Sequence, residues 1–176
     1  MSVLLLTGPP GIGKTTVVKK VAAALAELHL AGFYTEEIRR NGGRQGFELV
    51  TFEERRWIMA HVDSRSGQRL GRYGVDPEAI DAAVRLTLAG NLEADLFLVD
   101  EIGKMECFSA LFVQKVSSLL TLEKPVVATV ALKGGGFIAA VKELPGVALW
   151  EITRQNRNSM PGKIISWVKD QGLRKR

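Results

Sequence analysis

Short hydrophobic runs of strand length alternate with longer amphipathic segments along the whole chain. The strand-like runs cover residues 3–7, 33–39, 96–99, 125–130 and 147–150. Such alternation is typical of an α/β fold with a mostly parallel sheet and helices on both faces. Because 176 residues also suit one domain, we expect a single α/β domain over residues 1–176.

The amphipathic segments predict the helices between these strands. A helix over residues 14–28 follows the first strand, and residues 161–168 form the last helix. Between them, Asp76-Pro77-Glu78 supplies an N-cap, a first-turn proline and an acid that favours the helix dipole, and Gly90 ends that helix. Its apolar face carries Ile80, Ala83, Val84 and Leu88.

The second half of the chain predicts two more helices and a tail. One helix buries a row of apolar side chains, namely Phe108, Leu111, Phe112, Val116 and Leu119. The glycine-rich loop 134–136 precedes a short helix. Residues 169–176 are expected to form a frayed basic tail.

An antiparallel element interrupts the simple alternation of strands and helices. Residues 33–39 and 46–52 look extended, and Asn41-Gly42-Gly43 between them can adopt the positive φ values of a tight hairpin. One more strand is expected near residues 57–60. The sequence therefore predicts a parallel core with a hairpin attached.

Composition indicates where in the cell the protein is expected. The longest apolar stretches, residues 3–6 and 96–99, are far shorter than the roughly 20 residues of a membrane helix. We expect no secretory signal, because a glycine-proline turn follows only a handful of apolar residues. The lone Cys107 fits a reducing compartment, so we expect a cytoplasmic protein that does not contact membranes. His29 and His61 lack metal-ligand spacing, and a monomer is compatible with this composition.

Positive charge is concentrated in one segment of the chain. Residues 39–72 contain eight arginines, no lysine and four acids, within a total net charge of +5. One interpretation is a solvated basic face on the hairpin. The other is an arginine-rich surface that approaches phosphates or an acidic partner, which leaves binding to nucleic acid open.

The strongest motif lies between the first strand and the first helix. Residues 8–15 read GPPGIGKT and fit the Walker A template G-x-x-x-x-G-K-[ST] at every fixed position. Glycines allow backbone N–H groups to face phosphates, and the helix N-terminus adds partial positive charge. We expect Lys14 to reach the β and γ phosphates of a nucleotide and Thr15 to offer its hydroxyl to Mg²⁺.

An acid pair follows the buried run 96–99, as in a Walker B motif. Asp100 and Glu101 fall at the carboxyl end of this strand, where open α/β sheets bind ligands. Asp100 suits Mg²⁺, and Glu101 can polarise the attacking water. An ordinary pair of capping acids after a strand is the alternative.

Other side chains compete for roles in the same site. Glu36 and Glu37 end a neighbouring strand, and either could serve as the base instead of Glu101. Lys104 could stabilise negative charge in the transition state or be a solvated loop lysine. Thr129 could sense the γ phosphate, although a β-branched residue in a strand is more often structural.

These motifs together resemble a known family. The matching segments are GPPGIGKTT at 8–16, GFYTEEIR at 32–39, GF at 46–47 and DEIGKME at 100–106, with further matches at Gly71, Tyr73, Val75, Asp76 and 156–158. They resemble the thermophilic nucleoside-triphosphatase family, which includes the human cancer-related nucleoside-triphosphatase. The resemblance spans nearly the whole chain, and DEIGKME with FYTEE is far more specific than the phosphate loop alone.

The resemblance implies a RecA-like variant of the P-loop fold and slow, Mg²⁺-dependent hydrolysis of ATP, GTP, CTP, UTP and TTP to the diphosphate. It implies broad base tolerance. Asn156 and Arg157 follow a late strand and could lie near the base or ribose, but a plain loop entering a helix is an equal alternative. The expected nucleotide-binding residues are Gly8, Pro9, Pro10, Gly11, Ile12, Gly13, Lys14, Thr15, Thr16, Phe97, Leu98, Val99, Asp100, Glu101, Ile102, Gly103, Lys104, Asn156 and Arg157.

Two other functions compete with hydrolysis. A small P-loop kinase of a nucleotide, a nucleoside or a polynucleotide end would share the phosphate loop, but it needs an acceptor site and commonly an arginine-bearing lid, for which residues 39–72 are the obvious source. A nucleotide-gated binding module would use the same arginines for docking. No interleaved aromatic platform or nucleic-acid motif supports that module.

Overall fold

One twisted sheet of nine strands runs through the molecule. The computed structural model describes residues 2–91 and 93–172. The strand order is β5-β6-β4-β3-β2-β7-β8-β1-β9. The strands are β1 (Val3–Thr7), β2 (Leu30–Arg40), β3 (Gly43–Thr51), β4 (Arg56–His61), β5 (Arg69–Leu70), β6 (Tyr73–Val75), β7 (Leu96–Ile102), β8 (Val126–Val130) and β9 (Val147–Glu151).

The five strands β2-β7-β8-β1-β9 form the parallel part of the sheet. They are the five strands that the hydrophobic runs predict, although β2 begins at Leu30 and β7 continues to Ile102. Residues of β1 and β8 are buried throughout, as expected for strands covered on both faces. One strand, β8, therefore separates the strand before the phosphate loop from the strand that ends in the acid pair.

The antiparallel part is larger than the predicted hairpin. Strands β3, β4, β6 and β5 continue the sheet beyond β2, and we call these four strands the extension. Asn41 and Gly42 have φ values of 50° and 77° at the β2–β3 turn, which confirms the tight hairpin. The expected strand near 57–60 is β4. No pattern in the sequence predicts β5 and β6, which are only two and three residues long.

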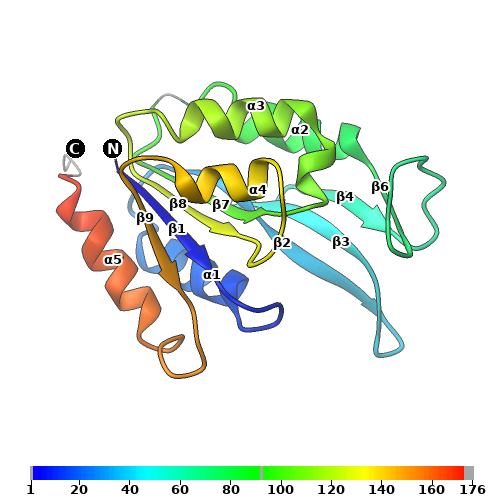
Figure 1. Ribbon diagram of the computed structural model, residues 1–176, viewed down its shortest axis with the longest axis horizontal. Coiled ribbons are helices and arrows are strands. Elements are labelled where there is room, and N and C mark those ends of the chain that lie inside the picture. Colours follow the sequence, from blue (N-terminus) through cyan, green and yellow to red (C-terminus); the bar gives the residue numbers. More distant parts are fainter. Residues whose placement is uncertain (1, 92, 173–176) are drawn as a thin grey trace.

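Helices cover both faces of the sheet (Figure 1). On one face lie α2 (Pro77–Thr87), α3 (Ala110–Leu119) and the short α4 (Phe137–Ala140); on the other lie α1 (Lys14–Ala24) and α5 (Met160–Asp170). Two 3₁₀ turns, Glu106–Phe108 and Val141–Glu143, complete the elements. Each face of the sheet packs its own hydrophobic core, so the parallel strands are enclosed from both sides.

Local chemistry accounts for most of the helix boundaries. The Asp76 carboxylate accepts hydrogen bonds from the backbone N–H groups of Glu78 and Ala79, which confirms the predicted N-cap of α2. That helix ends at Thr87, three residues before Gly90. Phe108 lies in a 3₁₀ turn before α3, because Ser109 caps α3 through the N–H of Phe112.

Two predicted helix ends differ from the structure. The first helix stops at Ala24 rather than residue 28, since Leu25 leaves helical geometry and the N–H of Leu28 bonds back to the Leu25 carbonyl in a closing turn. The last helix runs to Asp170, so the start of the expected frayed tail is helical. Residues 173–176 of that tail lie outside the described residues.

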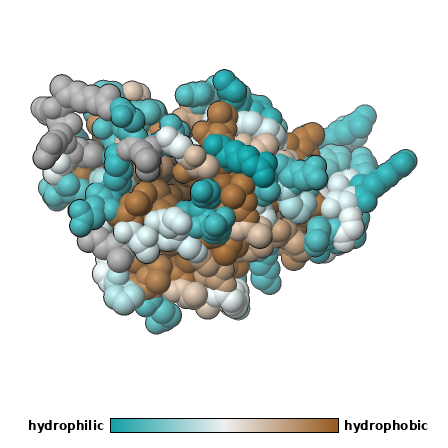
Figure 2. Space-filling model, turned by 90° about the horizontal axis from the view of Figure 1, so that it is seen from above, coloured by the Kyte–Doolittle hydropathy of each residue, from teal (hydrophilic) through white to brown (hydrophobic). Residues whose placement is uncertain are grey.

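The outer surface mixes polar side chains with small apolar areas. Figure 2 looks down on the face that carries α2 and α3, where apolar areas appear among polar ones. Leu86 of α2 is one of the large apolar side chains exposed on the protein, at 39%. Within the described part of the chain, no helix has the length and apolar character needed to cross a membrane.

Candidate functional site

The phosphate loop connects β1 to α1 at the carboxyl edge of the parallel strands. Gly11 and Gly13 have φ values of 74° and 106°, a region that residues with a side chain rarely adopt. These conformations turn the loop so that α1 begins at Lys14, where its unpaired N–H groups face the cavity. The Lys14 ammonium donates a hydrogen bond to the Gly8 carbonyl at 3.2 Å and so lies across the loop.

Asp100 lies at the centre of a hydrogen-bond network that joins four elements. The Thr15 hydroxyl at the start of α1 donates to Asp100 Oδ2 at 2.6 Å, and the Thr129 hydroxyl of β8 donates to Oδ1 at 2.6 Å. Thr35 of β2 donates its N–H to Oδ2 at 3.4 Å and its hydroxyl to the Asp100 carbonyl at 2.7 Å. This network holds the fully buried carboxyl beside the phosphate loop.

The chemistry around Asp100 fits a magnesium ion. Burial raises the pKa of Asp100, while hydrogen bonds from Thr129 and Thr15 and the charge of Lys14 act to lower it. A carboxylate and a hydroxyl are hard oxygen ligands, and Mg²⁺ is usually held by one or two carboxylates together with substrate phosphates. Within residues 2–91 and 93–172, no cluster of three or more His, Cys, Asp or Glu could hold a metal alone.

Glu101 follows Asp100 and points toward the phosphate loop. Its Oε2 lies 3.5 Å from the Lys14 ammonium, and the side chain is partly exposed to the cavity. Burial raises the pKa of Glu101, the charge of Lys14 lowers it, and Asp100 raises it further. A carboxylate with a raised pKa is a stronger base, so this side chain suits proton abstraction from water.

The competing acids on β2 are held in ion pairs. Glu36 pairs with Lys19 at 2.5 Å and with Arg56 at 3.0 Å, and the hydrogen bond with Lys19 is the largest cause that lowers its pKa. Glu37 pairs with Arg39 and Arg44; burial raises its pKa, but the hydrogen bonds with both arginines outweigh that effect and lower it. Both acids line the cavity as weaker bases than Glu101.

Glu106 is a residue of the site whose role the sequence analysis missed. Its side chain is 4% exposed, it lines the same cavity as Glu101, and burial raises its pKa to about 8. A Cβ added to Gly103 would lie 2.7 Å from Glu106 Oε2 and 3.4 Å from Glu101 Oε1. The two carboxyl groups therefore converge on the space that Gly103 leaves free.

Two cavities open at this edge of the sheet. The larger, about 1190 Å³, extends from the phosphate loop past Asp100 to the extension, and Lys104 and Glu101 line it. The smaller, about 350 Å³, lies between residues 9–12 and residues 151–157 and includes Arg157. Arg157 thus lies next to the phosphate loop, and its contact with a base or ribose stays a prediction.

Several side chains of the predicted site are buried or already bonded within the protein. The side chains of Phe97, Leu98 and Val99 are at most 1% exposed, so they fix the position of β7 and thereby of Asp100. Thr129 is fully buried and bonded to Asp100, which places it beside the acid rather than in the open cavity. The Asn156 side chain bonds the Thr153 N–H and the Glu151 carbonyl, both at 2.8 Å, so it builds the loop before α5.

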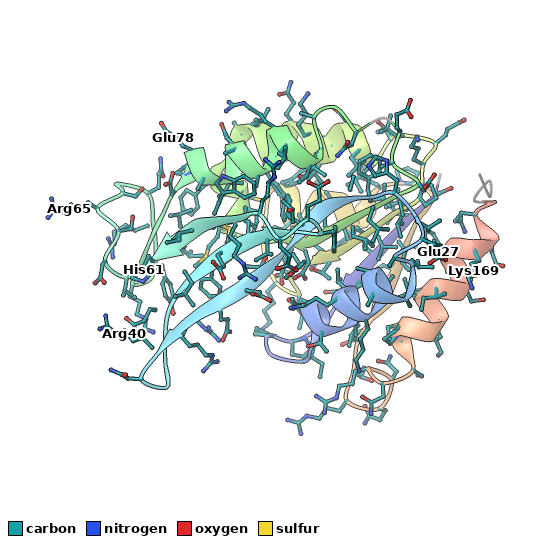
Figure 3. All side chains as sticks on the ribbon, turned by 180° about the vertical axis from the view of Figure 1, so that it is seen from behind. Glu27, Arg40, His61, Arg65, Glu78 and Lys169 are labelled. Atoms are coloured by element: carbon teal, nitrogen blue, oxygen red, sulfur yellow. The ribbon has the colours of Figure 1, made fainter. Side chains whose placement is uncertain are left out.

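Most arginine side chains of residues 39–72 form ion pairs or hydrogen bonds with other groups of β2 and the extension. Ion pairs join Arg39 and Arg44 to Glu37, and Arg56 contacts Glu36, Glu48 and Glu54. Arg69 and Arg72 donate to backbone carbonyls. Exposed Arg40 ends β2 at the tip of the hairpin, and exposed Arg65 lies in the loop between β4 and β5 (Figure 3). Five of the eight arginine side chains, those of Arg39, Arg44, Arg56, Arg69 and Arg72, therefore bond to groups of β2 and the extension.

Comparison with known proteins agrees with this geometry. A family model described as NTPase matches residues 3–165, which includes the phosphate loop, the acid pair and the extension. The chain belongs to this nucleoside-triphosphatase family. Among curated relatives, the nucleoside-triphosphatase THEP1 of Thermotoga sp. (strain RQ2) is 38% identical over 167 residues, covering 94% of this chain and 95% of the relative.

Relatives and solved structures extend from bacteria to humans. The cancer-related nucleoside-triphosphatase of Homo sapiens is 33% identical over 182 residues and covers 94% of this chain and 95% of its own. The solution structure of a human cancer-related nucleoside triphosphatase superimposes with a TM-score of 0.82 at 31% identity, covering 99% and 100% of the two chains. The crystal structure of THEP1 from Aquifex aeolicus gives 0.80 at 32% identity, with coverage of 94% and 98%. The fold is that of the P-loop nucleoside-triphosphatases.

Proposed function

We propose that the protein hydrolyses nucleoside triphosphates to the diphosphate and phosphate, with a requirement for Mg²⁺ and with broad tolerance of the base. The observation that carries the proposal is the 2.6 Å hydrogen bond between Thr15 and Asp100, beside the 3.5 Å ion pair between Lys14 and Glu101. The groups proposed to bind phosphate, to hold the metal and to act as the base are thus adjacent. The names of the relatives point to the same activity.

Each group has a distinct role in this proposal. The backbone of residues 8–15 and the Lys14 ammonium bind the phosphates, and Thr15 with Asp100 would hold Mg²⁺. Mg²⁺ held by these two side chains would neutralise negative charge that develops on the phosphate oxygens. Thr129 and Thr35 keep the Asp100 oxygens in place before nucleotide binds, so little reorganisation is needed.

Glu101 is the proposed general base. A water between the Glu101 carboxylate and the γ phosphate would lose a proton to Glu101 as it attacks phosphorus. The Lys14 ammonium, which lies 3.5 Å from Glu101, can stabilise the negative charge that develops on the phosphate oxygens. The exposed Lys104 lines the same cavity and adds positive charge near the reacting groups.

Broad base tolerance follows from what surrounds the smaller cavity. Base selection depends on buried polar groups that the wrong base would leave unpaired. The Asn156 amide is already used inside its loop, and the long polar side chains that line the cavity, Glu151, Arg154, Gln155 and Arg157, are exposed rather than buried. Arg157 offers charge rather than a base-specific pattern.

Substitution of the acids tests the base assignment. Glu101→Gln is expected to retain triphosphate affinity and to lose turnover by at least about 100-fold, since only the proton acceptor is removed. Glu37→Gln is the matched control on β2 and should keep turnover within about threefold. Normal hydrolysis by Glu101→Gln together with inactive Glu37→Gln would assign the base to β2 instead.

A substrate panel tests base tolerance. ATP, GTP, CTP, UTP and TTP are expected to be hydrolysed with kcat/KM values within roughly tenfold of one another. A preference above about 1000-fold for one base would show a dedicated base pocket.

The lone, half-buried Cys107 also leads us to infer a reducing, cytoplasmic setting.

A further inference from the structure

The larger cavity is lined by cationic side chains of two kinds. Those of the first kind pair with acids of the same cavity, Lys14 with Glu101, Lys19 with Glu36, and both Arg39 and Arg44 with Glu37. The others, Lys104 and Lys133, are exposed, and their side chains form no ion pair or hydrogen bond with any described residue. An ammonium group that no acid neutralises is available to a phosphate oxygen. The sequence motifs point to Lys104, and the structure adds Lys133.

Lys133 lies in the loop that leads from β8 to α4 (Figure 1). Strand β8 lies between β1, which enters the phosphate loop, and β7, which carries Asp100 and Glu101. The three strands are parallel, so their carboxyl ends meet at one edge of the sheet. The loop after β8 therefore begins between the phosphate loop and the acid pair, and its first three residues, 131–133, all line the larger cavity.

The start of this loop is fixed to both neighbouring strands. On the side of β1, the Thr7 hydroxyl donates a hydrogen bond to the Val130 carbonyl at 3.2 Å. On the side of β7, the Ala131 N–H donates to the Ile102 carbonyl at 3.1 Å. The strands that carry the phosphate loop and the acid pair thus also set the position of the backbone that leads into Lys133.

Lys142 holds the same loop from a separate element, the 3₁₀ turn Val141–Glu143. Its ammonium donates to the Ala131 carbonyl at 2.7 Å and to the Leu132 carbonyl at 3.0 Å, the two carbonyls directly before Lys133. Hydrogen bonds from a charged donor are stronger than those between neutral groups. Among the described residues, Lys142 is not part of the cavity lining, so it acts on the loop rather than on a ligand.

We propose that Lys133 is a catalytic residue that contacts the γ phosphate of the bound triphosphate, and that Lys142 is a positioning residue that holds the Lys133 loop beside it. The inference rests on the proposed triphosphate site. In phosphoryl transfer the negative charge spreads over three oxygens of the γ phosphate, so cations from more than one side can stabilise it. Lys14 approaches from the phosphate loop, and Lys133 approaches from the end of β8. A cation already in place needs little reorganisation when the transition state forms.

Nucleotide binding tests the contact of Lys133 without relying on turnover. Calorimetry on the full chain with Mg²⁺ gives the Kd of β,γ-imido-ATP, a triphosphate analogue that resists hydrolysis, and the Kd of ADP. Lys133→Ala should weaken binding of the analogue at least about fivefold and leave the Kd of ADP within about twofold, because ADP has no γ phosphate. The control Lys20→Ala removes an exposed, unpaired lysine of α1 outside both cavities and should change neither Kd.

The outcomes of this experiment separate the two proposals. An unchanged Kd of the analogue in Lys133→Ala, or equal weakening of the analogue and of ADP, would overturn the γ-phosphate contact. Lys133→Ala should also lower kcat for ATP at least about tenfold, and a normal kcat would overturn the catalytic role. A protein that binds the analogue through Lys133 but releases no phosphate from ATP would refute the hydrolase proposal and support the contact. Failure to bind either nucleotide would overturn both.

A double-substitution cycle tests the positioning role of Lys142. Lys142→Met should weaken binding of the analogue about fivefold and spare ADP, as Lys133→Ala does. The double variant should bind the analogue no more than about twofold more weakly than Lys133→Ala, because Lys142 acts through Lys133. In the control Lys124→Met, the lost ammonium bonds the Ala94 carbonyl away from both cavities, so the Kd should stay within about twofold. Effects that multiply in the double variant, or an unchanged Kd in Lys142→Met, would overturn this role.

Discussion

Replacement of Glu106 by glutamine should change how stability depends on pH. Burial, together with smaller effects of the charges of Glu101 and Asp100, raises the pKa of this carboxyl from an ordinary 4.5 to about 8. The folded protein therefore keeps a proton on Glu106 that the unfolded chain releases above about pH 4.5. Stability is lost as pH rises between these two values, since the native state binds more protons there than the unfolded state does.

The size of the effect follows from the two pKa values. At about 1.4 kcal/mol per pKa unit, the whole shift corresponds to roughly 5 kcal/mol of unfolding free energy above pH 8. Between pH 6 and pH 8.5, linkage gives a loss of about 2–3 kcal/mol. Glutamine has nearly the same shape as glutamate and cannot ionise. From pH 6 to pH 8.5, the unfolding free energy of Glu106→Gln should therefore fall by about 2–3 kcal/mol less than that of the unsubstituted protein.

Urea denaturation at pH 6 and pH 8.5 measures this difference. The exposed Glu123→Gln is the matched control, and its change with pH should equal that of the unsubstituted protein. Parallel curves for the unsubstituted protein and Glu106→Gln would refute the conclusion that burial keeps this carboxyl protonated.

Two further substitutions test the fold and the Asp100 network. Gly32→Ala should lower the free energy of unfolding by more than about 3 kcal/mol in urea denaturation, because the new Cβ would lie 1.9 Å from a backbone carbonyl oxygen of β7 and Gly32 has a φ of 118°. In the control Gly67→Ala nothing lies within 4 Å of the new Cβ, so the free energy of unfolding should change by less than about 0.5 kcal/mol. Thr129→Val should lower phosphate release about tenfold and raise the Mg²⁺ concentration for half-maximal rate, since Asp100 Oδ1 loses its donor. The buried Thr87→Val, on α2, should change neither.

Local signals in the sequence predict much of the fold. Buried runs give the five parallel strands, Asp76 gives the start of α2, and Asn41-Gly42 gives the hairpin. Each of these signals depends on neighbours within a few residues. The acid pair also lies at the carboxyl end of β7, where open α/β sheets usually bind their ligands. The functional assignments of these residues remain predictions.

Features that depend on distant contacts are not visible in the sequence. Strands β5 and β6 are too short to show periodicity. They form by pairing with neighbouring strands, β6 with the edge of β4 and β5 with β6. Glu106 looks like any loop acid until packing buries it next to Gly103. Thr35 and Thr129 acquire a common partner, Asp100, only when three strands come together. The sequence likewise gives no sign that five of the eight arginines of residues 39–72 bond to groups of β2 and the extension.

The central claim is that the phosphate loop and Asp100 form a magnesium-dependent triphosphatase site. The most direct measurement is phosphate release from ATP by the purified protein and by Lys14→Ala, each with Mg²⁺ and with excess EDTA. We predict release by the unsubstituted protein only with Mg²⁺, and at least about 100-fold less from folded Lys14→Ala. Near-normal release by folded Lys14→Ala, or full activity of the unsubstituted protein in EDTA, would contradict the claim.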